Sequence, residues 1–191
     1  MGTEIQTIVL PARKSVHELE EAVEQLISQD YPLSDILEKI LLWVEKEGSK
    51  DLVSSILLFN SETLQLFHGA APSLPLHYTE AVNGIFAAPS AGSCGTAAYR
   101  KEQVIVSDIE NHPFWSIYKT LALPIGLRAC WSNPLMSHNK ELLGTFAIYY
   151  RQPRKPLPED LAVINMVSDI SIYAIESRPE DFAVMTKSVK Q

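Results

Sequence analysis

Cys94 and Cys130 carry the most nucleophilic side chains of this 191-residue chain. Cys94 stands in the sequence GSCGTAA, where Ser93 can cap a helix. A thiol near the N-terminus of a helix can have a lowered pKa, which would favour thiol or redox chemistry. The simpler interpretation, which we favour, is that both cysteines are small buried apolar residues, as free cysteines usually are.

A second group of residues could bind a small molecule. With Cys94 included, the predicted ligand-binding set is Cys94, Trp115, Tyr118, Arg128, Trp131 and Thr145. An indole N–H near a guanidinium suits a small anionic or aromatic metabolite. Because side chains alternate along a strand, only one of Arg128 and Trp131 can face the pocket, and the alternation leaves open which. The alternative is that these aromatic residues fill the core.

The histidines do not suggest a metal site. They are His17, His68, His77, His112 and His138. No two lie at helical spacing or beside a cysteine, whereas a structural zinc needs about four ligands. The sequence also has no CxxCH motif for haem attachment and no glycine pattern that would hold a phosphate. We expect no metal, and the sequence identifies no cofactor.

The overall charge and hydropathy exclude other classes of partner. The net charge is -7 and the basic residues are scattered, so we expect no nucleic acid. The longest apolar run, residues 36–44, contains Glu38 and Lys39 and is far shorter than the roughly 20 residues of a membrane span. The first residues do not resemble a signal peptide. We therefore expect a cytoplasmic protein.

The segments around these candidates alternate between helix and strand. Ser15 and Glu18 form a capping box that predicts a helix up to Asp30, and a second helix is expected from Ser34 to Gly48. The expected elements that follow are strands at 52–59 and 63–68, a short helix at 78–82, a loop at 83–93, a helix at 95–99, a strand at 104–106, a helix from Pro113, strands at 127–132 (ended by Pro134) and 142–150, and a helix at 158–177. This order predicts an α+β fold.

Four segments resemble motifs of the GAF family of sensory domains, in the branch found in bacterial signalling proteins. They are GSCGTAAYR, VSDIENHPFW, GLRACWSNP and LLGTFAIYYRQPRKP. The resemblance covers residues 34–178, preceded by a lead-in and amphipathic helix at 1–33 and followed by a tail at 179–191. It implies a central, mostly antiparallel sheet with the N- and C-terminal helices on one face. The pocket is expected between the Pro113 helix, the 127–132 strand and the strand containing Phe146.

The resemblance implies a regulatory domain that senses a small molecule and relays its binding through the terminal helices. The expected partners are an unidentified ligand, a second copy of the chain and a kinase or diguanylate cyclase output module. The bilin and cyclic-nucleotide signatures of the family are missing from the sequence. The ligand, the output partner and the extent of the whole protein remain open.

Two alternatives remain. GSCGTAA also resembles a motif of free methionine sulfoxide reductases, which are built on a GAF scaffold, so Cys94 and Cys130 could serve a thiol enzyme or redox sensor. The further cysteines and strand carboxylates of those enzymes are missing here, and we therefore expect no enzyme activity. The second alternative is a ligand-free interaction module whose pocket is filled by its own side chains.

Overall fold

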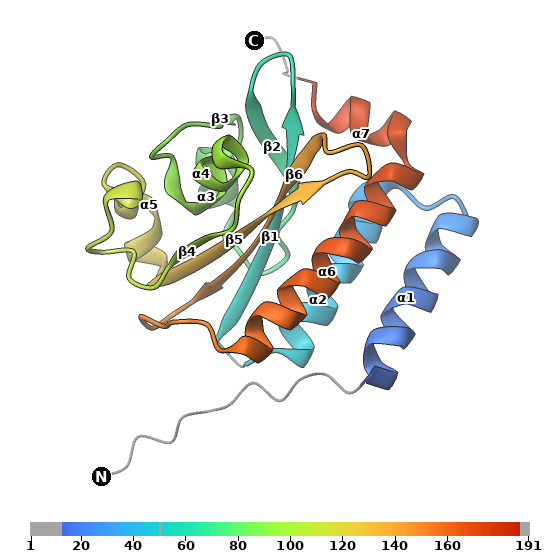
Figure 1. Ribbon diagram of the computed structural model, residues 1–191, viewed down its shortest axis with the longest axis horizontal. Helices are drawn as coiled ribbons and strands as arrows, with labels where there is room; N and C mark the ends of the chain where they lie inside the picture. Colours follow the sequence, from blue (N-terminus) through green and yellow to red (C-terminus); the bar gives the residue numbers. More distant parts are fainter. Residues whose placement is uncertain (1–12, 50, 188–191) are drawn as a thin grey trace.

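Six antiparallel strands form the centre of the computed structural model, which describes residues 13–49 and 51–187 (Figure 1). The strands are β1 (Leu52–Asn60), β2 (Gln65–Ala70), β3 (Ile85–Phe86), β4 (Val104–Val106), β5 (Ala129–Met136) and β6 (Leu142–Tyr150). Their order across the sheet is β3-β2-β1-β6-β5-β4. The apolar run of β1 lies between β2 and β6 and is buried from Leu52 to Leu58, as expected for a central strand covered on both faces.

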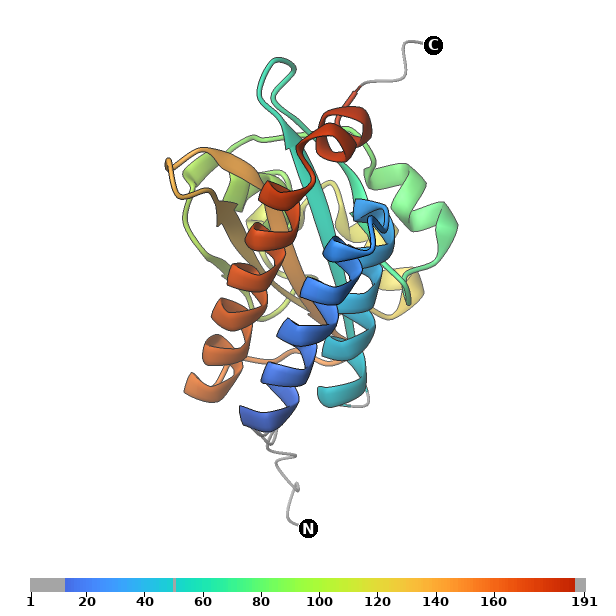
Figure 2. The same ribbon diagram turned by 90° about the vertical axis from the view of Figure 1, so that its right-hand side faces the viewer.

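Three helices cover one face of the sheet, which we call the helix face. They are α1 (Arg13–Ser28), α2 (Leu33–Glu47) and α6 (Pro158–Ser177). Figure 2 shows α1 lying against both α2 and α6. Their apolar stripes pack on Trp131, Phe146 and Ile148 of the sheet. Among the described residues, no helix has the combination of length and apolar character that crossing a membrane requires.

Shorter elements cover the opposite face, which we call the loop face (Figure 1). They are α3 (Leu76–Val82), α4 (Gly92–Arg100), the 3-10 turn η1 (Pro113–Trp115), α5 (Lys119–Ala122) and the 3-10 turn η2 (Leu123–Ile125). These elements pack on Leu57, Cys130, Ala147 and Tyr149 of the sheet. A last helix, α7 (Pro179–Met185), follows α6.

The predicted α+β fold is confirmed, including the terminal helices on one face and α4 on the other. Helix α6 begins as its sequence indicates: Pro158 is its first residue, and the Asp160 carboxylate accepts a hydrogen bond of 2.8 Å from the Leu157 N–H. Helix α1 begins at Arg13, two residues before the expected start. The Ser15 side chain, on which the predicted capping box depends, lies outside the described residues, as do residues 1–12 and 188–191.

Four local predictions were wrong. Pro134 does not end β5, because it lies beyond the stretch paired with β4, where a missing N–H is tolerated. The segment after Pro113 is not one helix but η1, α5 and η2 in succession. The expected loop at 83–93 contains β3. Ser93 is not a cap, because it lies inside α4 and bonds to β5 instead.

Candidate functional site

The start of α4 is shaped by its two glycines. Gly92 has a φ of +62°, in the left-handed region that side chains rarely adopt. At Gly95, a Cβ would lie 2.8 Å from the Phe86 carbonyl oxygen, so a larger residue would push α4 away from β3. The sequence GSCG therefore lets the helix begin in contact with the sheet edge and holds Ser93 and Cys94 over the sheet.

Ser93 joins three elements through its hydroxyl. The Ser93 Oγ donates a 3.0 Å hydrogen bond to the carbonyl oxygen of Cys130 on β5. It also accepts a 3.0 Å hydrogen bond from the Trp115 Nε1 of η1. All three residues are buried. Because both bonds are shielded from water, they fix the Trp115 ring over the start of α4.

A cavity lies beside this junction on the loop face. It is lined by Leu57, Tyr78, Val82, Ile85, Ala91, Gly92, Ser93, Cys94, Trp115, Tyr118 and Tyr149. Its free volume is about 20 Å³, which holds one or two water-sized groups. No lining side chain belongs to Asp, Glu, His, Lys or Arg, and the Cys94 thiol is the one group of the lining with a lowered pKa. The site therefore suits a very small, uncharged molecule.

The sheet beneath the cavity carries several buried polar atoms. The Tyr149 hydroxyl lies 3.8 Å from the Cys94 Sγ and 3.3 Å from the Ser55 Oγ. Ser132 and Thr145 belong to the same face of the sheet, since they alternate with Trp131 and Phe146 of the helix face. Their hydroxyl oxygens are buried and make no hydrogen bond of normal geometry among the described residues, although both lie close enough to the Cys94 thiol to influence its acidity. Such groups are uncommon in folded proteins and call for an explanation.

The two thiols meet in this polar region and differ in acidity. The neighbouring Cys130 thiol, helped by the hydroxyls of Ser132, Tyr149 and Thr145, lowers the pKa of Cys94 to about 7, although burial acts against this. Burial raises the pKa of Cys130 well above its ordinary value, and it does the same for the Tyr149 hydroxyl. Within residues 13–49 and 51–187, no three His, Cys, Asp or Glu side chains form a group able to hold a metal ion.

The GAF domain model matches residues 31–176, about three quarters of the chain. The chain belongs to the GAF domain family. A curated relative, the methyl sulfide methyltransferase-associated sensor of Methanosarcina acetivorans, is 37% identical over 164 residues. The match covers 82% of this chain but 16% of the relative, so this GAF domain corresponds to a small part of that sensor.

Solved structures share the fold at low sequence identity. A GAF sensor protein from Burkholderia vietnamiensis superposes with a TM-score of 0.64 at 17% identity, covering 83% of this chain and 92% of that one. The free methionine-R-sulfoxide reductase of Neisseria meningitidis gives a TM-score of 0.68 at 14% identity, covering 89% and 95%. At these identities the similarity establishes the fold alone.

The structure brings some of the predicted site residues of this GAF domain together. Cys94, Trp115 and Tyr118 line the loop-face cavity, and Thr145 lies in the sheet on the same face. Trp131 lies on the helix face, where its Nε1 donates to the Arg154 carbonyl oxygen.

Arg128 also lies outside the cavity lining. Its guanidinium donates to the carbonyl oxygens of Leu123 and Leu127 and so supports the turn η2. The strand register thus answers the question that alternation left open: the face carrying Cys130 looks toward the cavity side, and Trp131 looks away. The guanidinium that suggested an anionic ligand does not reach the site.

Sequence reasoning missed three residues of this region, Tyr78, Tyr149 and Ser132. Tyr149 could have been found, because it lies four residues after Thr145 on the same strand and must share its face. Ser132 follows from Cys130 in the same way. The sequence contains no comparable signal for Tyr78, which reaches the cavity from α3.

Proposed function

We propose that this GAF domain senses a very small, uncharged molecule that binds in the loop-face cavity. The observation that carries the proposal is a small cavity with largely apolar walls, in which the Cys94 thiol and the Tyr149 hydroxyl supply buried polar atoms. A ligand with one polar atom and an apolar remainder would match this lining, since its polar atom could bond to Cys94 or Tyr149 and the remainder would contact Leu57, Val82 and Ile85.

The size of the cavity limits the ligand. Its volume of about 20 Å³ accommodates one or two heavy atoms, so a three-atom molecule requires a small rotation of half-buried Tyr118 or Val82 in the wall. The best small ligands gain at most about 1.5 kcal/mol per heavy atom. Three atoms then give at most about 4.5 kcal/mol, which corresponds to a dissociation constant of about 0.5 mM or weaker.

Dimethyl sulfide is a suitable probe for this site. It has three heavy atoms, no charge, two methyl groups and a sulfur that accepts weak hydrogen bonds. The M. acetivorans relative is named for its association with a methyl sulfide methyltransferase. Dimethyl sulfide belongs to the same chemical class, the methyl sulfides. Acetate, of similar size but charged, is the matched negative control.

The proposal is tested by calorimetric titration of dimethyl sulfide into the protein in a sealed cell. We expect binding of dimethyl sulfide and none of acetate. Val82→Phe fills the cavity from α3 and should abolish binding. Val163→Phe, an equivalent change in a half-buried valine of the helix face, should leave it intact. No heat from dimethyl sulfide at 10 mM would instead favour a ligand-free interaction module.

Signal relay from this site is supported by a continuous path of hydrogen bonds and packing. Trp115 bonds to Ser93, and Ser93 bonds to the backbone of β5 at Cys130. Farther along β5, Asn133 donates a 2.8 Å hydrogen bond to the Ser168 hydroxyl of α6. A ligand that displaces Trp115 would therefore strain β5 and, through it, α6. We propose that α6 conveys ligand binding to an output module such as a kinase or diguanylate cyclase.

A homodimer formed through α1 and α6 is part of the same proposal. Tyr173 of α6 is 47% exposed beside Val23 and Ile170 in a groove between these helices. Light scattering should give the mass of a dimer. Removal of residues 1–31 should weaken the association of the two copies. A monomer at high micromolar concentration would contradict dimer-based signalling.

We propose that the protein does not reduce methionine sulfoxide, although the reductase fold is similar. The chain has two cysteines, and both are buried. The reductases need a carboxylate on the strand that corresponds to β6, but the β6 residues on the face of the site are Ala147 and Tyr149. An NADPH-coupled thioredoxin assay should give no turnover. Turnover that is lost in Cys94→Ser would overturn this and favour the redox alternative.

A further inference from the structure

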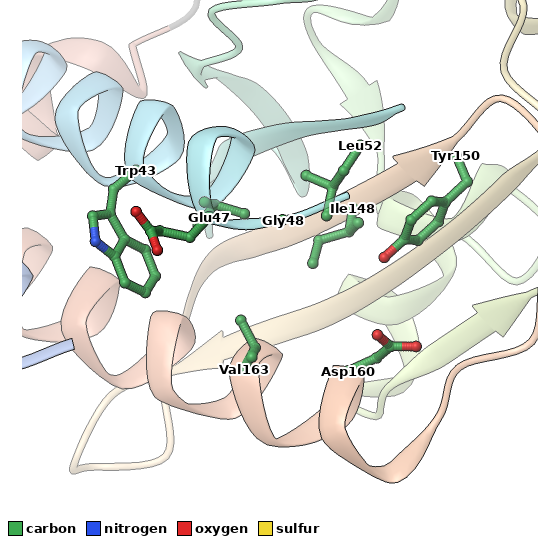
Figure 3. A pocket seen from close by; sticks show the side chains of 9 residues that line it. Trp43, Glu47, Gly48, Leu52, Ile148, Tyr150, Asp160 and Val163 are labelled. Carbon is green, nitrogen blue, oxygen red and sulfur yellow. The ribbon is translucent and has the colours of Figure 1, made fainter. Parts of the chain in front are cut away.

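A second cavity lies on the helix face, where the end of α2 meets the start of α6 (Figure 3). Its lining comprises Trp43, Val44, Glu47, Gly48, Leu52, Ile148, Tyr150, Asp160 and Val163. The enclosed volume is about 20 Å³, which is enough for one hydroxyl-sized group. Half-buried Trp43 and Glu47 form part of its wall.

Tyr150 provides an unpartnered polar group at this cavity. Its side chain is 3% exposed, and its hydroxyl oxygen is buried without a hydrogen-bond partner among the described residues. Figure 3 shows the hydroxyl directed into the space between Ile148 and Asp160. Burial raises the pKa of Tyr150, so its hydroxyl stays protonated and is able both to donate and to accept.

The charges around the cavity decide which head group it can take. The buried Asp160 carboxylate is paired with Arg154, whose Nη2 lies 3.1 Å and 3.3 Å from its two oxygens, and it also accepts from the Leu157 N–H. The charge of Asp160 is thus already balanced, so an ammonium group would lose its hydration for a single counter-charge, the partly exposed Glu47. A carboxylate group would face both Asp160 and Glu47. A neutral hydroxyl avoids both costs, because it can bond to Tyr150 and to a remaining lone pair of Asp160.

We propose that this cavity binds the hydroxyl group of a small alcohol. The hydroxyl occupies the enclosed space beside Tyr150, and the alkyl chain lies between α2 and α6 against Trp43 and Val163. The walls are otherwise apolar, with Leu52 and Ile148 contributed by the sheet. Such a combination of apolar walls and a single oriented polar contact is typical of small-molecule sites.

The location gives this site a separate consequence. An alkyl chain between α2 and α6 spreads the two helices that also support α1, without involving α4 or Trp115. The site is therefore a second input that acts directly on the helix face. It does not depend on the proposed function, because the two cavities lie on opposite faces of the sheet.

The inference is tested by titrating 1-propanol into ¹⁵N-labelled protein and following amide and indole chemical shifts. Propionate and propylammonium are the matched charged probes. We expect saturable shifts at the Trp43 indole, Tyr150 and Val163 with 1-propanol, and at least fivefold weaker binding of the two ions. Tyr150→Phe should weaken 1-propanol binding roughly threefold to tenfold, the usual effect of losing one hydrogen bond.

Two further variants make the result decisive. Val163→Phe fills the cavity and should abolish the shifts, and it serves in place of Tyr150→Phe if that variant does not fold. Val82→Phe, in the loop-face cavity, should leave them unchanged. The inference is overturned if Tyr150→Phe binds 1-propanol as tightly as the wild type, if Val82→Phe removes the shifts, or if 1-propanol causes no saturable shift.

Discussion

The two faces of the sheet bury polar side chains in different ways. On the helix face, Ser168 and Ser171 donate to carbonyl oxygens of their own helix, and Ser54 donates to Glu45. On the loop face, the hydroxyls of Ser132 and Thr145 have no partner among the described residues. A satisfied polar group is compatible with a stable core, whereas an unsatisfied one is costly unless something binds to it. Tyr150 is the exception on the helix face, because its hydroxyl also has no partner among the described residues. The polar groups of the helix face are thus mostly satisfied, whereas the loop face leaves two hydroxyls unpartnered in the layer beneath its cavity.

Strand β6 contributes side chains to both faces of the sheet and shows the contrast most simply. Phe146 and Ile148 point to the helix face and are fully or almost fully buried among apolar residues. Thr145 and Tyr149 point to the loop face and belong to the polar layer. Substitutions at neighbouring positions of β6 should therefore have opposite effects on stability.

The largest effect is expected at Phe146. Phe146→Ala removes a completely buried ring from the helix-face core and should lower the free energy of unfolding by about 4 kcal/mol. Urea unfolding followed by circular dichroism measures this. A loss below about 1 kcal/mol would mean that the helix face is not tightly packed.

Alkaline pH should act on the loop face. Cys130 and Tyr149 have folded-state pKa values well above their ordinary 9.0 and 10.0, so the unfolded chain releases these protons first as pH rises. The free energy of unfolding then falls by up to about 1.4 kcal/mol per pH unit for each group. Stability should decline above about pH 9, and more gradually in Tyr149→Phe. An identical slope in that variant would show that Tyr149 does not contribute.

Cys94 should have the opposite dependence. Its pKa of about 7 lies below the ordinary value of 9.0, so its contribution to stability is present at higher pH and is lost as pH falls through 7. The wild type should therefore lose stability between about pH 9 and pH 6 relative to Cys94→Ala. The measurement is denaturant unfolding of both proteins across this range. Parallel curves would indicate that the Cys94 thiol is not acidified.

A smaller effect is expected from Trp115→Phe. The substitution removes the indole N–H that bonds to Ser93, while the ring still covers the cavity, so stability should fall by about 1 kcal/mol. Trp131→Phe, on the helix face, provides the comparison. If the relay path is correct, Trp115→Phe alters the response of α6 to ligand and Trp131→Phe does not, as a fluorophore attached to α6 would report.

The smallest effect is expected next to Phe146. Thr145→Val replaces an unpartnered buried hydroxyl with a methyl group and should leave stability unchanged or raise it by up to about 1 kcal/mol. A clear loss of stability without ligand would indicate that the hydroxyl has a structural partner, which would weaken the distinction between the faces.

The sequence predicted the fold well because local and long-range signals agree. The apolar run of β1, the Pro158 start of α6 and the four GAF-like motifs all indicate the same architecture. The site was predicted less completely. The position of Cys94 in GSCGTAA and the aromatic pair Trp115 and Tyr118 indicated three residues that line one cavity, but alternation along β5 could not tell which face Trp131 occupies.

That ambiguity has a physical cause. Both faces of this sheet are covered, so apolar residues occur at successive positions of β5 and no polar side marks the solvent. The position of Arg128 is decided by its bonds to Leu123 and Leu127 carbonyls, which depend on the turn η2. The unpartnered state of Ser132 likewise depends on tertiary neighbours and leaves no trace in the sequence.

The central claim is that the loop-face cavity receives the small uncharged ligand. Crystals equilibrated with dimethyl selenide, which has the shape of dimethyl sulfide, locate the molecule through the anomalous signal of selenium. The account predicts one selenium peak between Cys94, Trp115 and Tyr149, which is lost in Val82→Phe and kept in Val163→Phe. A peak confined to the helix-face cavity, or no peak in crystals saturated with the probe, would contradict it.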